Sequence, residues 1–362
     1  MNFAETAASH FRLDGPAVSC EKYGCGHING TYLVITDKGT KYILQRVNGT
    51  VFRNIPGLMR NVRLVTDHIA RKISDPRGVL RLVLADDGAD TYCDAQGEIW
   101  RVFDFVTDSL CLQAPETPED FYRSAIAFGT FQQQLADFPA ETLAETIPNF
   151  HNTPDRYRKL HGSIERDVRS RAAGAKYEID EYLSREEMGG ELMRRLSAGI
   201  LPLKVTHNDT KLNNVMFDAA TREPLCVIDL DTVMPGLVAF DFGDSIRFGA
   251  ATAAEDETDL SKMTVDLDLY RTFLRGFLTA CPDLTDAEIE SLPLGAKIIT
   301  LENGVRFLTD YLDGDVYFAI DRPDHNLLRT RTQLRLVQEM ERKWDEMLRI
   351  TAEEKARARG MV

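Results

Sequence analysis

The residue pattern changes near residue 106, and this change limits the folds that the chain can adopt. Between about residues 18 and 106, strand-like runs alternate with turn signals, and the runs at residues 31–36 and 41–47 flank the turn Asp37-Lys38-Gly39. This arrangement predicts a β-hairpin. One amphipathic helix interrupts the strands, because apolar residues recur at steps of three or four: Leu58, Val62, Val65, Ile69 and Ile73. The first part of the chain is therefore predicted to be an antiparallel sheet with one packed helix.

Helical patterns dominate after about residue 115. We expect helices at residues 121–137, 178–184, 292–312 and 324–356, with only short strands among them. A chain of 362 residues has room for two lobes, each with its own core. The sequence therefore predicts an α+β fold in which residues 1–106 form a small sheet-rich lobe and residues 107–362 form a larger, mostly helical lobe.

The composition excludes some classes of partner. The hydrophobic fraction is 43% and the net charge is −14, which suits a soluble globular protein and repels a polyanion such as nucleic acid. The six cysteines are scattered without metal-binding spacing, and we expect reduced thiols. No apolar run approaches the roughly 20 residues of a membrane helix, and no signal-peptide pattern is present. We therefore expect a cytoplasmic protein with no membrane partner, as a monomer or a weak dimer.

Two short strings in the second part of the chain predict the chemistry. The first runs from His207 to Asn214 in the pattern His-x-Asp-x-x-x-x-Asn, and the second places Asp229 at the end of a predicted hairpin. Phosphoryl transfer needs a carboxylate that accepts the proton of the attacking hydroxyl, and Asp209 is the candidate. Asn214 and Asp229 offer one neutral and one charged oxygen, ligands that suit a Mg²⁺ ion that is shared with phosphate oxygens. The strings therefore predict a phosphoryl-transfer site.

Residues around these strings receive supporting roles. Lys211 lies two residues after Asp209, where its ammonium group could offset charge on the transferring phosphate, although a solvated loop lysine is the alternative. His207 is interpreted as structural, packed behind the loop. Asp241 and Asp244 come later than Asp229, so we interpret them as carboxylates that brace the loop by hydrogen bonds; contact with the metal or the substrate is the alternative.

A glycine-rich turn lies between two predicted strands near the N-terminus. Residues 23–32 include Gly24 and Gly26, and glycines at such a turn let backbone amides approach phosphate oxygens. The position of the turn, in the sheet-rich part of the chain and upstream of the His-x-Asp loop, favours a nucleotide-binding role.

These motifs together resemble the aminoglycoside phosphotransferase and choline kinase superfamily, whose members have a bilobal protein-kinase-like fold. Longer strings are similar to the N-acetylhexosamine 1-kinase group of that superfamily. The similar strings include Gly26-His27-Ile28-Asn29, Tyr42-Ile43-Leu44-Gln45, residues 206–214, Ile228-Asp229-Leu230-Asp231-Thr232, residues 241–249, Arg306-Phe307-Leu308, His325-Asn326-Leu327 and residues 329–333.

The resemblance implies a reaction and a set of site residues. ATP and N-acetylglucosamine or N-acetylgalactosamine would give the sugar 1-phosphate and ADP, with Asp209 as the base at the anomeric hydroxyl. The exit of the strand at residues 100–106 would receive adenine through backbone groups, at Asp104, Phe105 and Val106. Sugar hydroxyls and the acetamide would be bound by His27, Arg306 and Tyr317. For Arg306, an ion pair with Asp310 one helical turn away is the alternative.

One position departs from the superfamily pattern. The third-strand lysine that usually pairs with the nucleotide's α- and β-phosphates is replaced by Gln45, and the helix that follows carries Arg60, Asn61 and Arg63 where a partner glutamate would be sought. Gln45 could bind phosphate weakly, or Lys41, Lys211 or the glycine-rich amides could supply the charge. We favour Lys211.

Other functions stay open at this point. The same fold could phosphorylate homoserine, choline, an aminoglycoside or methylthioribose. The absent lysine–glutamate pair also allows a nucleotide-binding pseudokinase scaffold, although Asp209, Asn214 and Asp229 argue for an active enzyme.

Overall fold

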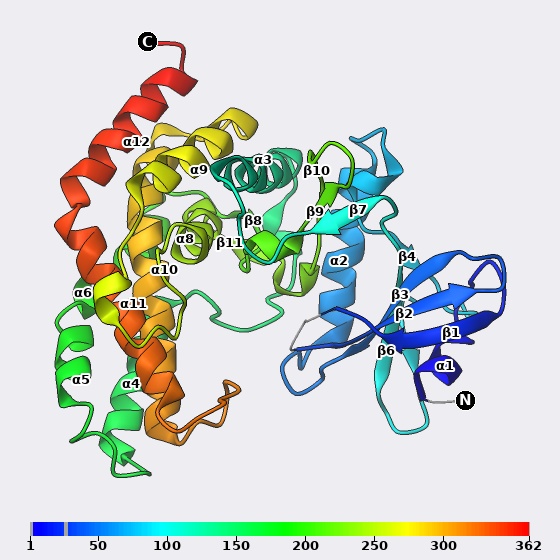
Figure 1. Ribbon diagram of the computed structural model, residues 1–362, viewed down its shortest axis with the longest axis horizontal. Coiled ribbons are helices and arrows are strands. Elements are labelled where there is room, and N and C mark those ends of the chain that lie inside the picture. The colour runs from blue at the N-terminus through cyan, green and yellow to red at the C-terminus, as the bar shows by residue number, and fades with distance from the viewer. Residues whose placement is uncertain (1–2, 25–27, 362) are drawn as a thin grey trace. The chain divides into compact units, whose positions relative to one another are not determined.

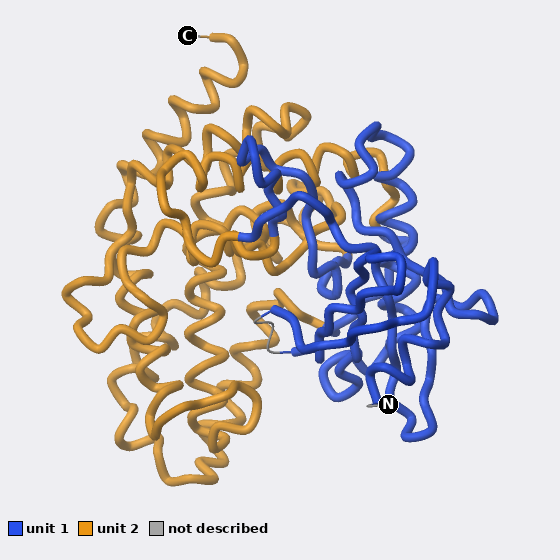
Figure 2. The backbone as a smooth tube through the Cα atoms, turned by 45° about the vertical axis from the view of Figure 1, so that its right-hand side comes forward, with its two compact units in different colours: residues 1–111, 141–148, 215–234 blue, residues 112–140, 149–214, 235–362 orange. Residues whose placement is uncertain are grey.

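The computed structural model describes residues 3–24 and 28–361 and divides into two compact units. Unit 1 contains residues 1–111, 141–148 and 215–234, and unit 2 contains residues 112–140, 149–214 and 235–362 (Figure 2). Strands dominate the N-terminal part and helices the C-terminal part, so the predicted α+β class is confirmed. The predicted lobe boundary between residues 106 and 107 lies within the first segment of unit 1, and it stays a prediction.

The large sheet of unit 1 has six antiparallel strands (Figure 1). Four of them run in the order β1 (Ala17–Lys22), β2 (Gly30–Thr36), β3 (Lys41–Val47) and β6 (Ile99–Asp104), and β4 (Leu82–Val83) and β5 (Tyr92–Cys93) both pair with β6. The β2–β3 pair confirms the predicted hairpin. Gly39 lies at its turn with a φ of 80°, a backbone conformation that favours glycine.

Successive side chains along each strand of this sheet point to opposite faces. Tyr42, Leu44, Trp100 and Val102 are buried in one core together with α1 (Phe3–Ala8). Gln45 and Arg101, one position further along each strand, lie directly opposite one another on the other face, in register with Thr31. The sheet therefore presents a polar row of three residues across three adjacent strands.

The rest of unit 1 contributes a helix and a second sheet. The helix α2 (Ile55–Ala70) begins at Asn54, whose side chain accepts a hydrogen bond from the Gly57 amide. Four residues of the predicted apolar stripe, from Leu58 to Ile69, are buried in it, whereas Ile73 lies beyond the end of the helix and is half-buried. The strands β7 (Ser109–Cys111), β9 (Val215–Asp218) and β10 (Pro224–Val227) form an antiparallel sheet, in which β9 and β10 are the predicted second hairpin. This hairpin ends next to Asp229.

Unit 2 is mostly helical, and its longest helix, α10 (Asp286–Asp313), packs against α8 (Val238–Gly249), α11 (His325–Arg342) and α4 (Thr153–Arg166) (Figure 1). A Cβ atom on Gly243 of α8 would lie 2.5 Å from the Gly295 carbonyl oxygen of α10, so glycine permits this close approach. The remaining elements of the unit are α3 (Pro118–Gln134), α5 (Lys176–Leu183), α6 (Glu186–Gly189), α7 (Glu191–Ser197), α9 (Leu267–Ala280), α12 (Trp344–Ala358), β8 (Lys204–Thr206) and the short helical turns η3 (Leu212–Asn214) and η5 (Leu260–Lys262).

Two predictions about the C-terminal helices are wrong. The helix expected at residues 292–312 begins six residues earlier, where Thr285 and Glu288 form a capping box, and it continues through Pro293. The single helix expected at residues 324–356 is two helices that meet at Lys343, whose ammonium group donates to Thr264 Oγ1 and the Val265 carbonyl at 2.8 and 2.7 Å. Within residues 3–24 and 28–361, none of the helices is long and apolar enough to cross a membrane.

Candidate active site

The loop from His207 to Asn214 follows β8 and is held in place by Asp241 of α8. The backbone amides of His207 and Asn208 donate to the two carboxylate oxygens of Asp241 at 2.9 and 2.7 Å. Gln132 of α3 donates to the same carboxylate at 2.6 Å. Burial raises the pKa of Asp241, although His207 and these donors oppose that effect. Asp241 therefore fixes the start of the loop through hydrogen bonds to its backbone amides.

Asp244, one turn further along α8, holds the middle of the loop. Its carboxylate accepts the Thr210 amide at 3.1 Å and pairs with Arg247 at 3.0 Å. The Ser245 hydroxyl donates to the Thr210 carbonyl at 2.9 Å. The prediction that Asp241 and Asp244 brace the loop is thus confirmed, and buried backbone groups here have fixed partners.

Asp209 lies on this loop with its carboxylate bound on two sides. Lys211 Nζ lies 2.7 Å from Asp209 Oδ1, and Asn214 Nδ2 donates to Asp209 Oδ2 at 3.1 Å. Burial acts to raise the pKa of Asp209, but Lys211, His207 and Asn214 outweigh it and hold this pKa below its ordinary value. Asp209 is therefore a carboxylate at neutral pH, able to accept a hydrogen bond from an acceptor hydroxyl.

His207 is fully buried beneath the loop. Its ring makes edge contacts with Phe128 and Phe131 of α3, at centroid distances of 5.7 and 5.9 Å, and its Nδ1 accepts the Asp209 amide at 3.3 Å. The predicted structural role of His207 is confirmed: it sets the backbone that carries Asp209.

The two predicted magnesium ligands belong to different units. In unit 2, the amide nitrogen of Asn214 also donates to the Asp209 carbonyl, at 2.8 Å, which leaves Asn214 Oδ1 as the oxygen available to a cation. In unit 1, Asp229 follows β10 in the left-handed backbone conformation, with a φ of 59°. The described residues contain no cluster of three or more His, Cys, Asp or Glu side chains that could hold a metal ion by themselves. That Asn214 and Asp229 bind one ion stays a prediction.

In unit 1, the glycine-rich turn lies near the segment predicted to bind adenine, through a contact between Tyr23 and Phe105. Gly24 has a φ of 76°, and Tyr23 beside it contacts the Phe105 ring edge-on at a centroid distance of 6.0 Å. The amides of Asp104 and Phe105 donate to the carbonyls of Arg81 and Lys41. Within the described residues the Val106 amide has no such backbone partner, and its contact with adenine stays a prediction. Gly26 and His27 lie outside the described residues.

Gln45 belongs to a buried polar network that the sequence did not predict. Its Oε1 accepts from Nε and Nη2 of Arg101 at 3.0 and 2.8 Å, and its Nε2 donates to Thr31 Oγ1 at 3.2 Å. Arg101 in turn forms an ion pair with Asp231 at 2.6 Å. The only sequence signal for this network is a charged residue, Arg101, inside the otherwise apolar run at residues 99–103.

Arg306 of α10 lies in an aromatic cluster of unit 2. Its guanidinium group lies 5.3 Å from the ring centroids of both Phe150 and Phe318 and donates to Asn303 Oδ1 at 3.2 Å. The alternative of an ion pair with Asp310 is wrong, because the Asp310 carboxylate accepts the backbone amides of residues 316, 317 and 318.

A second residue missed by sequence reasoning connects this cluster to Asp209. His151, adjacent to Phe150, approaches the Asn208 carbonyl through Nε2 at 3.4 Å and Glu302 through Nδ1 at 2.8 Å. Glu302 precedes Arg306 by one turn of α10, about 6 Å along the helix. The aromatic cluster and Arg306 therefore lie close to the loop that carries Asp209, within unit 2.

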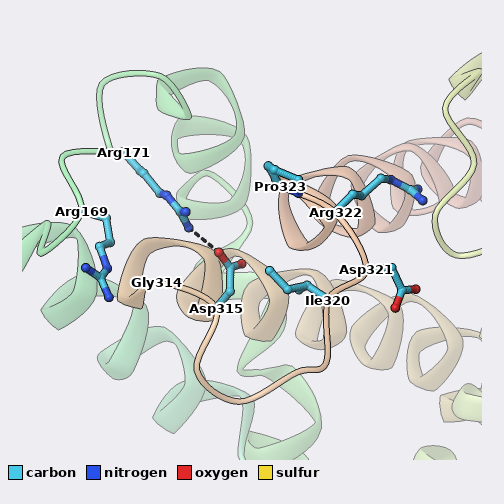
Figure 3. Close-up of a pocket in the computed structure, with 8 residues that line it drawn as sticks. All are labelled: Arg169, Arg171, Gly314, Asp315, Ile320, Asp321, Arg322 and Pro323. Carbon is cyan, nitrogen blue, oxygen red and sulfur yellow. Dashed lines mark hydrogen bonds and ion pairs between the residues drawn. The ribbon is translucent and has the colours of Figure 1, made fainter.

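Tyr317 lies on the segment that joins α10 to α11, and its side chain is 58% exposed. Its ring contacts Phe318 edge-on at 4.8 Å, and Asp310 holds its backbone. The segment is also anchored through Asp315, toward which Arg171 extends in Figure 3, at 2.6 Å. A pocket of ≈ 560 Å³ lies beside this anchor and contains no predicted site residue; it is lined by Arg169, Arg171, Gly314, Asp315, Ile320, Asp321, Arg322 and Pro323.

Comparisons with known proteins agree with this geometry. Residues 19–273 match a family described as the phosphotransferase enzyme family. The structure is similar to an aminoglycoside phosphotransferase from Alicyclobacillus acidocaldarius, with 14% identity, a TM-score of 0.59, and coverage of 98% of this chain and 96% of that chain. It is also similar to a choline/ethanolamine kinase family protein from Mesorhizobium loti, with 15% identity, a TM-score of 0.58, and coverage of 97% and 99%.

A third solved structure, an amicoumacin kinase in complex with AMP-PNP and Ca²⁺, has 16% identity, a TM-score of 0.59 and 91% coverage of both chains. At these identities the structural likenesses establish the fold, and the predicted protein-kinase-like fold is confirmed. The family match covers more than half of the chain. The chain therefore belongs to the phosphotransferase enzyme family.

Proposed function

We propose that the protein transfers the γ-phosphoryl group of ATP to the anomeric hydroxyl of an N-acetylhexosamine, N-acetylglucosamine or N-acetylgalactosamine, and releases the sugar 1-phosphate and ADP. The family membership supports a small-molecule kinase. The choice of acceptor rests on one observation: the cluster next to the Asp209 loop holds two arginines over one aromatic ring, while its carboxylates are paired with other groups of the protein.

The cationic character of this cluster comes from two arginines that share the Phe150 ring. Arg306 lies over it at 5.3 Å and Arg156 at 5.9 Å, and Arg156 also donates to the Phe150 carbonyl at 2.5 Å. Burial lowers the pKa of Arg156, and the charge of Arg306 lowers it further, as expected for two cations held close together.

The carboxylates of the same region are bonded inward. Glu302 accepts from the buried Thr153 hydroxyl at 2.6 Å and contacts His151, and Asp310 is fully engaged with backbone amides and Asn326. An amine-bearing acceptor such as ethanolamine or an aminoglycoside needs carboxylates around its cationic group. The quaternary ammonium group of choline needs aromatic rings that no other cation covers, whereas Arg306 and Arg156 already lie over the Phe150 ring. Guanidinium groups beside aromatic rings suit a neutral sugar instead, since they donate to hydroxyls and to an acetamide carbonyl while a ring covers its apolar face.

The residues of the loop have complementary roles in this proposal. Asp209 accepts the hydrogen bond of the anomeric hydroxyl, aims its oxygen at the γ-phosphorus, and takes up the proton as the O–P bond forms. Lys211 keeps Asp209 ionised in the resting enzyme and lies where its ammonium group can turn to the transferring phosphate. Asn214 and Asp229 would bind Mg²⁺, which neutralises phosphate charge when bound. In unit 1, the Val106 amide would bind adenine, and the glycine-rich turn would bind phosphates.

An acceptor panel tests the proposal. MgATP is incubated with N-acetylglucosamine, N-acetylgalactosamine, glucose, galactose, choline, ethanolamine and homoserine, and ADP release is measured. We expect the two N-acetylhexosamines to give the highest kcat/KM. If choline or ethanolamine is phosphorylated and none of the sugars is, the acceptor assignment is refuted, whereas the kinase assignment stands.

Two variants connect the panel to the residues. Asp209→Asn keeps the shape of the side chain but loses its ability to take up a proton, and we expect kcat to fall by about 10²–10⁴-fold, with MgATP binding retained in isothermal titration. Arg306→Lys keeps the charge but removes the planar donors, and we expect the sugar KM to rise about tenfold, which corresponds to about 1.4 kcal/mol. MgATP binding without turnover of any acceptor by the wild type would support the pseudokinase alternative.

A further inference from the structure

A buried ion pair in unit 1 lies two residues from the predicted metal ligand Asp229. Arg101 and Asp231 approach to 2.6 Å, and their side chains are only 2% and 3% exposed. Asp231 lies in the short turn η4 (Leu230–Thr232) that begins directly after Asp229. The position of the Asp229 backbone is therefore coupled to the partners of Asp231.

Asp231 has a second fixed partner on its other oxygen. Asn29 Nδ2 donates to Asp231 Oδ2 at 2.6 Å, and Asn29 Oδ1 accepts the Asn48 amide at 2.9 Å. Asn29 immediately precedes β2, at the end of the glycine-rich segment, and Asn48 immediately follows β3. One carboxylate thus connects the entry of β2, the exit of β3 and the turn that carries Asp229.

Arg101 contributes more to this network than its pair with Asp231. Its Nε and Nη2 atoms donate to Gln45 Oε1, which directs the Gln45 amide nitrogen toward Thr31 and away from the guanidinium group. Its Nη1 also lies 3.8 Å from Met59 Sδ of α2. Arg101 therefore has partners on the strand β3, the helix α2 and the turn η4, and Asp231 has Arg101 and Asn29 as partners.

Such a pair is costly to bury, because the loss of hydration of both charges offsets their attraction, and apolar residues of similar size commonly give equal stability. Its presence next to a candidate ligand is better explained by orientation, because groups that hold a metal ligand from behind strongly affect metal affinity.

We propose that Arg101 is a positioning residue for the nucleotide–metal site: through Asp231 it fixes the turn that presents the Asp229 carboxylate to the cation of the metal–nucleotide complex. This inference rests on the proposed kinase function and on Asp229 as a metal ligand. In this proposal Arg101 acts through Asp231 and makes no contact with the nucleotide. The role is distinct from that proposed for Lys211, whose ammonium group would act on the transferring phosphate directly.

The test uses binding without any sugar, so that the identity of the acceptor does not affect it. The full-length protein is titrated with Mn²⁺ in the presence of ADP, and bound Mn²⁺ is measured by electron paramagnetic resonance, while the Tm is measured in parallel. Three variants are compared with the wild type: Arg101→Met, the charge-free double variant Arg101→Met with Asp231→Asn, and Arg275→Met. The last breaks a peripheral ion pair of unit 2, between Arg275 and Glu354 at 2.8 Å, and controls for general destabilisation.

The three variants separate positioning from stability. Arg101→Met leaves Asp231 buried and without its cation, so it should lower both the Tm and the Mn²⁺–ADP affinity. The double variant removes both charges, so the Tm should recover most of that loss, while the Mn²⁺–ADP affinity stays about 10- to 100-fold below the wild type. Arg275→Met should lower only the Tm.

Recovery of wild-type Mn²⁺–ADP affinity in the double variant would overturn the inference, because the pair would then serve stability alone. Absence of Mn²⁺–ADP binding in the wild type would instead contradict the proposed kinase function itself. The two failures are thus distinguishable in one set of titrations.

Discussion

Replacing Lys211 with methionine should move the acidic limb of the pH profile for kcat/KM to higher pH. Lys211 holds the pKa of Asp209 below its ordinary value, and the ionised carboxylate is the form that accepts the proton. A group with a depressed pKa stays ionised as the pH falls until that pKa is reached. Without Lys211 the pKa of Asp209 rises, and activity is lost at a higher pH.

The size of this effect follows from the geometry of the pair. At the observed 2.7 Å, two unit charges attract by about 6 kcal/mol if the effective dielectric constant is about 20. The side chains are 33% and 28% exposed, however, so water screens the pair, and we reduce the value to about 1.5–3 kcal/mol. An attraction of this size favours the ionised carboxylate by about 10- to 100-fold, so at a given pH on the acidic limb kcat/KM of Lys211→Met should lie well below that of the wild type.

The assay is kcat/KM for the sugar at saturating MgATP, measured across the acidic range for the wild type, Lys211→Met and Lys211→Arg. Arginine keeps the charge and should leave the limb near its wild-type position. A limb that does not move in Lys211→Met would refute the coupling of Lys211 to Asp209. If turnover and ATP affinity are also unchanged, Lys211 has no role at the phosphate either.

Two further variants test the carboxylates that hold backbone segments of the site: Asp241 at the Asp209 loop and Asp310 at residues 316–318. Asp241→Asn removes one of the two carboxylate acceptors for the loop amides, so kcat should fall by about 10²-fold through misplacement of Asp209, while titration shows nearly unchanged MgATP affinity. Asp310→Asn weakens the hydrogen bonds to residues 316–318, and we expect the free energy of unfolding to fall by about 1–3 kcal/mol in urea titrations. The same variant should raise the sugar KM through Tyr317 and leave the Kd for MgADP unchanged; an unchanged sugar KM would remove Tyr317 from the acceptor site.

Local sequence signals were sufficient for much of the fold. The Asp37-Lys38-Gly39 turn and the apolar stripe beginning at Leu58 are short-range patterns, and the hairpin and α2 form where these patterns predict them. The bracing role of Asp241 was also predictable, because a carboxylate at the start of a buried helix near a loop has few other partners than backbone amides.

The helix boundaries failed for physical reasons that are visible in the structure. The helix expected from residue 292 begins at Asp286, where Thr285 and Glu288 form a capping box. Pro293 lies in the eighth position of this helix, and packing retains the helix despite the lost hydrogen bond. Lys343 carries no helix-breaking signal. Its bonds to Thr264 and Val265, about 80 residues away in the chain, end α11 there.

The supporting residues of the site were not predictable from the sequence. Arg101 and Asp231 are separated by 130 positions, and their pairing depends on the strand register and on the turn after β10. His151 similarly reaches Asn208 and Glu302 only through the packing of unit 2. Motifs therefore identified the groups proposed to touch substrates, whereas the groups that orient them required the tertiary structure.

The position of the phosphate in the product tests the central claim most directly. After reaction of MgATP with N-acetylglucosamine or N-acetylgalactosamine, the ³¹P NMR spectrum is recorded without proton decoupling. A phosphate on the anomeric oxygen is coupled to the single anomeric hydrogen and gives a doublet, which is the result we expect. A triplet, from coupling to the two hydrogens of the sixth carbon, or a signal only from phosphorylated choline in the mixed panel, would contradict the proposed function.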